Sequence, residues 1–346
     1  MIPDAFSKIK SLAHLYLNDN EFDGGIPKSF DSMCNLKTLS LIWANLKGKF
    51  LGIIHNLTGC AQHSIKNLYL DSNQITGKLP DLSIFPSLRV LSLFNNHLNG
   101  IIPESLGKQS NLETLRLRDN SFEGVISETY FSKLKKLKNL DLSHTPLILN
   151  FNSNWVPPFQ LERIFLRPCQ LGPPQFPKWL QTQKNCYWLD ISNSGISDNI
   201  SHFCWGFSPQ LQFLDLSNNQ ISGHIPKFSL EISNFPFIDL SSNNLEGEIP
   251  SFLFKVAHLN LSQNMFSEPI QSLCAIKNEF LIFLDLSNNR LSGELPDCWM
   301  HLAGLKILNL KNNHFFGKIP RSMGLLLGIE TIDLRNNSFS GEIPSS

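Results

Sequence analysis

The fold of this chain is decided by the stretch Leu214-Asp215-Leu216-Ser217-Asn218-Asn219-Gln220-Ile221-Ser222-Gly223-His224-Ile225-Pro226. It begins with leucines that alternate with polar residues, continues through an Asn pair, and ends in Gly-His-Ile-Pro. Side chains alternate between the two faces of a strand, so this start predicts a short strand with its leucines pointing inward. Related stretches recur at 238–250 and 284–296. The stretch is therefore one copy of a repeat.

The repeat runs through all 346 residues. Its apolar starting residues lie about 23–25 positions apart, except for a longer repeat after Leu36 and a shorter one after Val256. These starting residues are Leu12, Leu36, Ile65, Leu88, Leu112, Leu137, Leu161, Cys186, Leu211, Phe235, Val256, Leu281, Leu305 and Ile329. A period of about 20–29 residues is typical of the leucine-rich-repeat solenoid, an α/β fold. We predict a curved right-handed superhelix with a parallel sheet on its concave face and short helical or 3-10 segments on its convex face.

We predict a single array of about 14 repeats over residues 1–346, because the period leaves little room for a second domain. Residues 1–10 lack the apolar segment of a signal peptide, and 341–346 stop partway through a repeat. No apolar run is long enough to cross a bilayer. Terminal repeats normally depart from consensus to shield the exposed core. We therefore expect an internal piece of a longer protein that lacks both terminal caps.

Two features of each repeat predict architecture rather than function. An Asn follows the strand, where its amide can pair backbone groups that the turn would bury. These residues are Asn20, Asn73, Asn96, Asn120, Asn219, Asn243, Asn264, Asn289, Asn313 and Asn337. The Gly-x-Ile-Pro element then predicts a second short extended stretch.

The Asn position departs from consensus in four repeats, at Ala44, Thr145, Cys169 and Ser194. Thr and Ser can still form hydrogen bonds, whereas Ala cannot replace the amide. The last three departures are consecutive, in a section that also loses Gly-x-Ile-Pro. We interpret this section as a local irregularity in curvature or convex-side packing. A distortion connected with binding is the alternative.

Several motifs resemble those of a known family. The Leu-x-Gly-x-Ile-Pro pattern, as at 98–103, resembles the plant-specific class of leucine-rich repeats. The stretches 155–161, 169–173, 176–183, 189–197 and 295–299 are similar to plant receptor-like proteins of the ethylene-inducing-xylanase receptor group. The resemblance covers essentially the whole chain and departs from the family at Phe203-Cys204-Trp205. It implies the ectodomain fragment of a plasma-membrane immune receptor, on the extracellular side, with one membrane span and no kinase in the full-length protein.

The seven cysteines indicate an oxidising compartment. Cys274 and Cys298 occupy the same position in adjacent coils, about 5 Å apart, which suits a disulfide. Cys34 and Cys60 bracket the long repeat and are a second candidate pair. Cys169 and Cys186 should point inward as small hydrophobic residues, and Cys204 has no obvious partner.

Four Asn-x-Ser/Thr triplets are candidate N-glycosylation sites: Asn56, Asn199, Asn260 and Asn336. Such triplets also arise by chance in a repeat that is rich in Asn and Ser. Asn260 lies on the predicted concave strand, where a glycan would obstruct a ligand. Together with the disulfides, the triplets favour a secreted or cell-surface protein.

Catalysis is not indicated by the sequence. No phosphate-binding loop, zinc motif or nucleophile motif occurs, so we predict no catalytic residue, cofactor or metal site. A column of carboxylates recurs at one strand position, and we interpret it as hydrogen bonding within the repeat surface; it comprises Asp141, Asp190, Asp215, Asp239, Asp285 and Asp333. Lys+Arg and Asp+Glu both number 29, and this balance argues against a nucleic-acid partner. The run 133–138 reads as a solvated basic edge.

Ligand binding is a better hypothesis than catalysis, because the same strand position can be compared between repeats. Strand positions that keep Leu-Asp-Leu-Ser are scaffold, and those that depart from it can specialise. Departures with aromatic or Arg side chains, which are enriched at interfaces, cluster in the first seven repeats and just beyond. Besides His14 and Tyr16, the ligand-binding candidates are Tyr69, Phe94, Arg116, Arg118, Arg163, Phe165, Arg167 and Trp188.

We therefore predict a module that binds a protein or peptide on its concave face. The resemblance implies signalling through a partner kinase that carries its own repeat ectodomain. A secreted repeat-protein inhibitor of a microbial cell-wall-degrading enzyme is one alternative, and a truncated receptor fragment without function is another.

Overall fold

The structure of this chain is a computed structural model that describes residues 1–203, 205, 210–227 and 236–343. It divides into two compact units. Unit 1 comprises Met1–Pro173 and Pro177–Asn185, and unit 2 comprises Pro174–Phe176 and Cys186–Ser346. Both units have the predicted leucine-rich-repeat architecture, while the single array over 1–346 stays a prediction.

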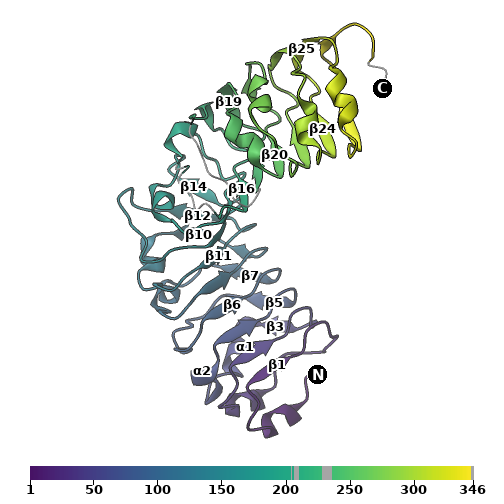
Figure 1. Cartoon of the computed structure of the whole chain (residues 1–346). Coiled ribbons are helices and arrows are strands. Elements are labelled where there is room, and N and C mark those ends of the chain that lie inside the picture. The colour runs from purple at the N-terminus through teal and green to yellow at the C-terminus, as the bar shows by residue number, and fades with distance from the viewer. Residues whose placement is uncertain (204, 206–209, 228–235, 344–346) are drawn as a thin grey trace. The chain divides into compact units, whose positions relative to one another are not determined.

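Unit 1 is built around parallel strands of three residues each, one strand per repeat. The middle residue of each strand is buried, from Leu15 to Ile164, so the alternation read from the sequence is confirmed. In Figure 1 these strands are stacked side by side. They are β1 (His14–Tyr16), β2 (Thr38–Ser40), β4 (Asn67–Tyr69), β6 (Val90–Ser92), β8 (Thr114–Arg116), β11 (Asn139–Asp141) and β13 (Arg163–Phe165).

Unit 2 repeats this plan, again with one strand per repeat and a buried middle residue in most of the strands. Its strands are β15 (Trp188–Asp190), β16 (Phe213–Asp215), β18 (Phe237–Asp239), β20 (His258–Asn260), β22 (Phe283–Asp285), β24 (Ile307–Asn309) and β26 (Thr331–Asp333). The first and third residues of each strand point away from the core. We call this outward side of the sheet the strand face of each unit.

A second set of short parallel strands follows the first around each coil. In unit 1 these are β3 (Lys47–Lys49), β5 (Gln74–Gly77), β7 (His97–Gly100), β9 (Ser121–Phe122), β10 (Gly124–Ile126), β12 (Leu147–Asn150) and β14 (Gln170–Gly172). In unit 2 they are β17 (Ser222–His224), β19 (Asn244–Gly247), β21 (Met265–Phe266), β23 (Ser292–Glu294), β25 (His314–Gly317) and β27 (Ser338–Phe339).

These second strands correct one expectation. The extended stretch lies mostly before Gly-x-Ile-Pro rather than on it: β7 ends at Gly100, whose φ is +75°. Glycine adopts a positive φ without steric cost. In β17 and β23 the glycine with positive φ, Gly223 or Gly293, lies inside the strand instead. The Ile-Pro that follows instead leads into a helical turn, with Pro103 as the residue before it.

Short helical segments complete the coils, and most of them are 3-10 helices. Those of unit 1 are η1 (Asp4–Lys8), η2 (Lys28–Ser32), η3 (Glu104–Lys108), η4 (Glu128–Phe131), η5 (Lys178–Thr182), α1 (Phe50–His55) and α2 (Ala61–Ser64). Those of unit 2 are η6 (Ile200–His202), η7 (Ser251–Lys255), η8 (Gln271–Ala275), η9 (Trp299–Leu302) and η10 (Arg321–Leu325). The two α-helices occupy the long repeat after Leu36, which accounts for its extra residues. No helix in the described part of the chain is long and apolar enough to span a membrane.

An Asn that follows a strand, such as Asn289, binds the backbone of its own repeat and of the repeat before it. The Nδ2 of Asn289 donates to the carbonyl oxygens of Leu261 (3.0 Å), Leu286 (3.1 Å) and Ser287 (3.2 Å). Its Oδ1 accepts from the backbone N–H of Phe266 at 3.1 Å. The side chain is buried, so the predicted role of this Asn in satisfying the turn is confirmed.

The irregular section of unit 1 is explained by packing on the helical side. The Trp155 ring lies against the rings of Phe131, Phe151, Phe159 and Trp179, with centroids 4.7–6.1 Å apart. Aromatic clusters of this kind bury large apolar areas. The motif residues of this section therefore form a core, in agreement with the interpretation as irregular packing.

The cysteines behave as predicted where they are described. Disulfides join Cys34 to Cys60 and Cys274 to Cys298, with Cα–Cα distances of 4.7 and 5.6 Å. Cys169 and Cys186 are free and buried, and burial raises their thiol pKa values to about 11 and about 12. These two thiols are therefore protonated at neutral pH. Cys204 lies outside the described residues.

Candidate functional site

The predicted ligand-binding residues of unit 1 fall into columns that cross its strands. Strand register aligns the third strand positions, so Tyr69, Arg116 and Phe165 share one column with Ser92 and Asp141 between them. Adjacent strands lie about 4.8 Å apart. Tyr69 and Arg116 are therefore about two strand spacings from each other, and Arg116 and Phe165 likewise.

A second column lies two residues further along each coil. Backbone hydrogen bonds between successive coils align Phe94, Arg118 and Arg167 in it, each next to a residue of the first column. Arg163 begins β13, two residues before Phe165. Seven of the eight predicted residues thus lie together on the strand face of unit 1. Trp188 begins β15 and belongs to unit 2.

Arg116 is the electrostatic centre of this surface. Burial raises the pKa of the Asp71 carboxyl to about 6, while the Phe94 N–H, 3.0 Å from its Oδ1, and the Arg116 charge act against that rise. Burial also raises the pKa values of Tyr69 and Asp141, and Arg116 opposes both shifts. The charge of one guanidinium therefore acts on two partly desolvated carboxyl groups and a phenol.

Arg118 is held in place by a neighbour. Its Nε lies 2.8 Å from Oδ2 of Asp119, whose Oδ1 lies 3.6 Å from Nδ1 of His144. About half of the Arg118 side chain is still exposed. Because exposed ion pairs contribute little to stability, this pair orients the guanidinium more than it stabilises the fold.

Sequence reasoning missed one residue of this surface, Trp43. Its φ is +52°, in the left-handed region that a bulky side chain rarely adopts, and the side chain is 61% exposed. The equivalent positions of other unit 1 repeats hold Asp19, Ser72, Asn95 and Asp119. Comparing repeats at this turn position, rather than only on the strand, would have found it. Strain of this kind is concentrated at functional sites.

Trp43 lines an open cleft of about 790 Å³ in unit 1. Carboxylates, amides and one imidazole share the cleft with the indole; the other lining residues are Asp19, Asn20, Glu21, Asn45, Ser72, Asn73, Gln74, Asn95 and His97. The lining is thus mostly polar, and Trp43 is its one large apolar ring.

Replacing Trp43 by Asn is expected to stabilise unit 1 by about 1 kcal/mol, because Asn tolerates the left-handed conformation and the Trp ring is mostly exposed. Urea unfolding followed by circular dichroism measures the change. The matched control is Asn95→Trp, which places the same ring at the equivalent position and should destabilise by a similar amount. A Trp43→Asn protein that is less stable than the parent would show that the indole serves packing.

The carboxylates of this column accept hydrogen bonds within the repeats, as predicted. The Oδ1 atoms of Asp190, Asp215 and Asp285 each accept from the backbone N–H of the Ser two residues later, at 2.8–3.1 Å. Asn260 and Asn309 replace Asp in this column and donate to Asp239 and Asp285. Burial raises the pKa of Asp215 to about 6, and the neighbouring charges of Asp190 and Asp239 add to the rise.

Replacing Asp215 by Asn is expected to stabilise the protein at pH 7. A carboxyl group whose pKa is higher in the folded state gives stability at low pH that is lost as pH rises from about 4 to about 6. The amide keeps the Oδ1 acceptor for Ser217 and has no charge, so the gain should be near zero at pH 4 and about 2 kcal/mol at pH 7.

Denaturation midpoints at several pH values measure this difference. Asp333→Asn is the control, because its pKa is lowered to about 2 by Arg335 and the change should not stabilise the protein. An Asp215→Asn protein that is less stable than the parent at pH 7 would contradict the assignment.

The four candidate glycosylation sites stay predictions. Nδ2, the atom that a glycan would modify, donates to the Ile26 carbonyl in Asn56 and to Asn312 in the exposed Asn336. In Asn260 it donates to Asp239 Oδ2 at 2.9 Å, on the strand face. Asn199 uses its Oδ1 to accept from Ser201 N–H. Modification of Asn260 would therefore remove a hydrogen bond between two repeats.

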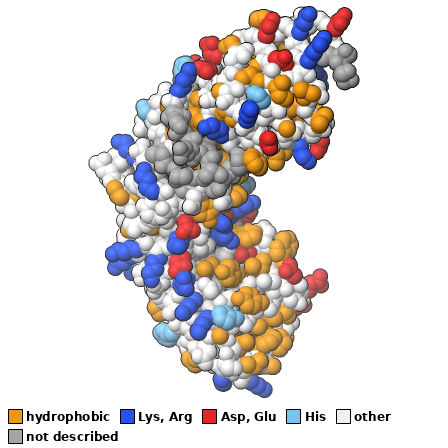
Figure 2. Space-filling view, viewed as in Figure 1, with side chains coloured by type: hydrophobic (Ala, Val, Ile, Leu, Met, Phe, Trp, Pro, Cys, Tyr) orange, Lys and Arg blue, Asp and Glu red, His pale blue; other side chains and the backbone are white. Residues whose placement is uncertain are grey.

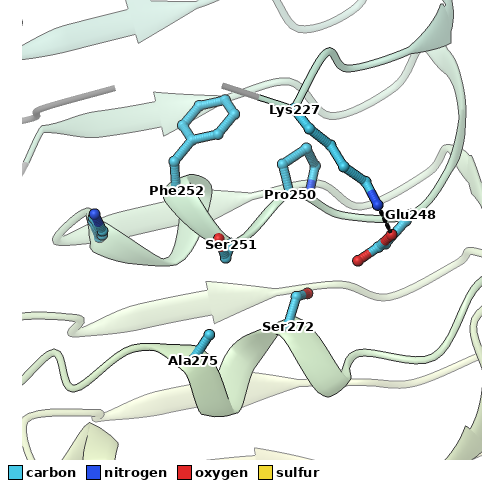
Figure 3. Close-up of a pocket in the computed structure, with 8 residues that line it drawn as sticks. Lys227, Glu248, Pro250, Ser251, Phe252, Ser272 and Ala275 are labelled. Carbon is cyan, nitrogen blue, oxygen red and sulfur yellow. Dashed lines mark hydrogen bonds and ion pairs between the residues drawn. The ribbon is translucent and has the colours of Figure 1, made fainter. Parts of the chain in front are cut away.

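A cavity of about 500 Å³ lies in unit 2 beside η7 and η8, and Figure 3 shows its lining. Ser251 and Phe252 come from η7, and Ala275 comes from η8. Lys227 Nζ and Glu248 Oε2 are 2.5 Å apart, so these two charged groups are paired with each other. This pairing leaves the cavity a weaker candidate than the strand faces.

Charged side chains of both signs are interspersed over the visible face in Figure 2, in keeping with a formal net charge of zero. Within the described ranges, no cluster of His, Cys, Asp and Glu is arranged to hold a metal ion. The features that define a site are therefore the residue columns of the strand faces.

Comparison with known proteins agrees with this fold. Leucine-rich-repeat family models match residues 86–147 and also 11–33, 210–230, 237–256, 280–302, 304–326 and 328–346, together more than half of the chain. The chain belongs to the leucine-rich-repeat family. Within that family it is related to the plant receptor-like proteins of the EIX group, as the sequence motifs predict.

Receptor-like protein EIX2 of Solanum lycopersicum is 40% identical over 379 residues, which cover 89% of this chain and 37% of that protein. The chain thus spans a little over a third of the length of EIX2. The Arabidopsis receptor kinase HAESA, in complex with the peptide hormone IDA and the co-receptor SERK1, matches at a TM-score of 0.64 and 27% identity over 99% of this chain and 69% of that chain. The PEPR1–AtPEP1 structure matches at a TM-score of 0.72 and 27% identity, over 98% of this chain and 50% of that chain.

Proposed function

We propose that this chain is the extracellular ligand-recognition module of a plant cell-surface immune receptor. It binds a protein or peptide on the strand face of unit 1 and signals through a partner kinase with its own leucine-rich-repeat ectodomain. The full-length receptor acts at the plasma membrane, with this chain outside the cell. The module recognises its ligand and does not catalyse a reaction.

One observation carries the proposal: four Arg and three aromatic side chains lie in register on one face of unit 1. Arg and aromatic residues are the types that contribute most at interfaces, because they bury area and make directed polar contacts. Arg116 and Arg118 stand on one strand and its extension, so a ligand carboxylate or carbonyl could contact both. Trp43 adds an exposed indole to the same unit.

The relatives support the kind of ligand and partner. HAESA binds the peptide hormone IDA together with the co-receptor SERK1, and the PEPR1 structure is a complex with AtPEP1. EIX2 is a receptor-like protein. The two disulfides support an extracellular setting, since such bonds persist in oxidising compartments.

A binding assay with a purified ethylene-inducing xylanase tests the proposal. This chain, secreted from plant cells, is immobilised, and both xylanase binding and the activity of the bound enzyme are measured. We expect saturable binding that leaves the enzyme active. Absence of binding would contradict a xylanase as the protein ligand of this chain.

The alternative is a secreted inhibitor of a microbial cell-wall-degrading enzyme. The same assay separates it from a receptor, because an inhibitor must cover the active site of its target. Binding that abolishes xylanase or polygalacturonase activity at stoichiometric ratio would favour the inhibitor. A non-functional fragment would bind neither enzyme and would unfold without cooperativity.

A further inference from the structure

A column of five stacked rings crosses the strand face of unit 2. Each ring belongs to the first residue of its strand, and the strand register pairs each with the next; they are Trp188, Phe213, Phe237, His258 and Phe283. Successive centroids are 4.6, 4.8, 4.0 and 4.0 Å apart, with interplanar angles of 12°, 8°, 17° and 2°. We call this column the ring column. All five side chains are partly exposed.

The fold does not require rings at this position. In unit 1 the first strand residues are mostly polar, and those strands pair in the same parallel register; they are His14, Thr38, Asn67, Val90, Thr114, Asn139 and Arg163. Aromatic pairs across strands do contribute to stability. A partly exposed row of mostly apolar rings in one unit and a polar row in the other still mark a difference in surface chemistry, and apolar surface left open to solvent marks interaction sites.

The geometry of the stack restricts what can bind to it. Because the rings lie face to face, their faces are covered by one another along the column, and ring edges are left toward solvent. The edge of an aromatic ring carries the positive end of its quadrupole, and the face carries the negative end. The column therefore lacks the open faces that sugars and guanidinium groups stack on. It offers a narrow apolar ridge instead.

Carboxylates run parallel to this ridge. Two residues after each ring, about 7 Å along the strand, lie Asp190, Asp215, Asp239, Asn260 and Asp285, which we call the acid column. The backbone N–H groups of Ser192, Ser217 and Ser287 bind one oxygen of their Asp and fix its orientation. The second oxygens of Asp239 and Asp285 accept from Asn260 and Asn309, which keeps these carboxylates in place. A negative strip thus lies beside an apolar one.

We propose that the strand face of unit 2 binds an extended segment of a partner protein in which apolar residues alternate with Lys or Arg. Successive side chains of an extended chain point to opposite sides, about 3.3 Å apart along its axis. A segment lying between the two columns therefore directs its apolar side chains to the ring column and its basic side chains to the acid column. The basic side chains complement the charge of the acid column.

This surface uses other strands than the ligand-recognition surface proposed for unit 1, and it carries carboxylates in place of Arg side chains. Binding at either surface can therefore fail without the other. Only Trp188 was predicted from the sequence. The other rings were overlooked because each stands just before the consensus segment that was compared, which is Leu-Asp-Leu after Phe213 and Phe283 and a close variant after Phe237 and His258.

The test uses synthetic peptides of about ten residues and the full chain. Alternating Val-Lys is compared with Val-Glu and with a block peptide that has the same composition as Val-Lys but separates its Val and Lys residues. Isothermal titration calorimetry should give binding of the alternating Val-Lys peptide, at least tenfold weaker binding of the block peptide, and none of Val-Glu. Raising the salt from 0.05 to 0.5 M should weaken the binding, because the contacts with the acid column are screened.

The variant F213T/F237T places at two ring positions the residue that unit 1 carries at Thr38 and Thr114, so the fold is expected to persist. It should bind the alternating peptide at least tenfold more weakly. F316T is the control, because it removes an exposed ring of β25 that is not part of the ring column; it should leave peptide binding unchanged.

Three results would overturn the proposal. Equal binding of the alternating and block peptides would indicate unspecific charge attraction. Unchanged binding by F213T/F237T, with reduced stability, would show that the rings serve packing alone. Binding of xylohexaose to the parent chain but not to F213T/F237T would assign the rings to a sugar.

Discussion

Replacing Asn289 by Leu is expected to destabilise unit 2 by about 3 kcal/mol. The substitution leaves the buried Phe266 N–H without its acceptor and removes the donor for three carbonyl oxygens. A buried backbone group without a partner costs about 1–3 kcal/mol, and Leu restores only volume. Urea unfolding gives the change in free energy, and hydrogen exchange at the Phe266 amide should accelerate.

The control for this change is Asn244→Leu. Asn244 begins β19, directly after Asn243, which is the residue of its repeat equivalent to Asn289. The side chain of Asn244 is exposed. Its replacement should change stability by no more than about 0.5 kcal/mol. If Asn289→Leu and Asn244→Leu behaved alike, the Asn ladder would not be what holds adjacent repeats together.

Reversing three charges on the strand face of unit 1, in R116E/R118E/R167E, is expected to weaken xylanase binding at least about a hundredfold. Truncation of one interface Arg at a hot spot costs about 2 kcal/mol, and reversal adds repulsion. Arg116 also faces Asp71 and Asp141, so Glu at this position adds a third carboxylate there. Biolayer interferometry measures the loss, and circular dichroism checks the fold.

The matched control is K133E/K135E/K136E, which changes net charge by the same amount. Its three Lys residues are exposed and precede β11 rather than lying on the strand face. This protein should bind xylanase within about threefold of the parent. Equal losses in the two variants would indicate long-range attraction in place of contact at the strand face.

Much of the fold was predictable because equivalent residues recur at a nearly constant spacing along the chain. The spacing of leucines predicted the strands. The position of Cys274 and Cys298, each seven residues before the start of its repeat at Leu281 or Leu305, predicted a disulfide. The role of the Asn after each strand was predictable because a short side-chain amide supplies both donors and an acceptor to a turn. Each of these depends on local geometry that recurs in every coil.

Features that depend on departures from the pattern were harder to predict. The positive φ of Gly100, which ends its strand before Ile-Pro, is a backbone property that the Gly-x-Ile-Pro motif does not reveal. Trp43 was missed because only strand positions were compared between repeats, and Trp43 lies in the turn after the strand. Phe213 and Phe237 could be recognised as a stacked pair only once the strand register was known. Stacking of their rings requires two aligned repeats and cannot be read from one repeat alone.

The central claim is that unit 1 meets its ligand on the strand face. Hydroxyl-radical footprinting of the unmodified chain, with and without xylanase, tests it directly. We predict that oxidation of Tyr69, Phe94 and Phe165 falls on ligand addition, while that of Leu51 in α1 and Val156 in the irregular section, both exposed, stays the same. Protection of Leu51 and Val156 with no change at Tyr69, Phe94 and Phe165 would contradict it.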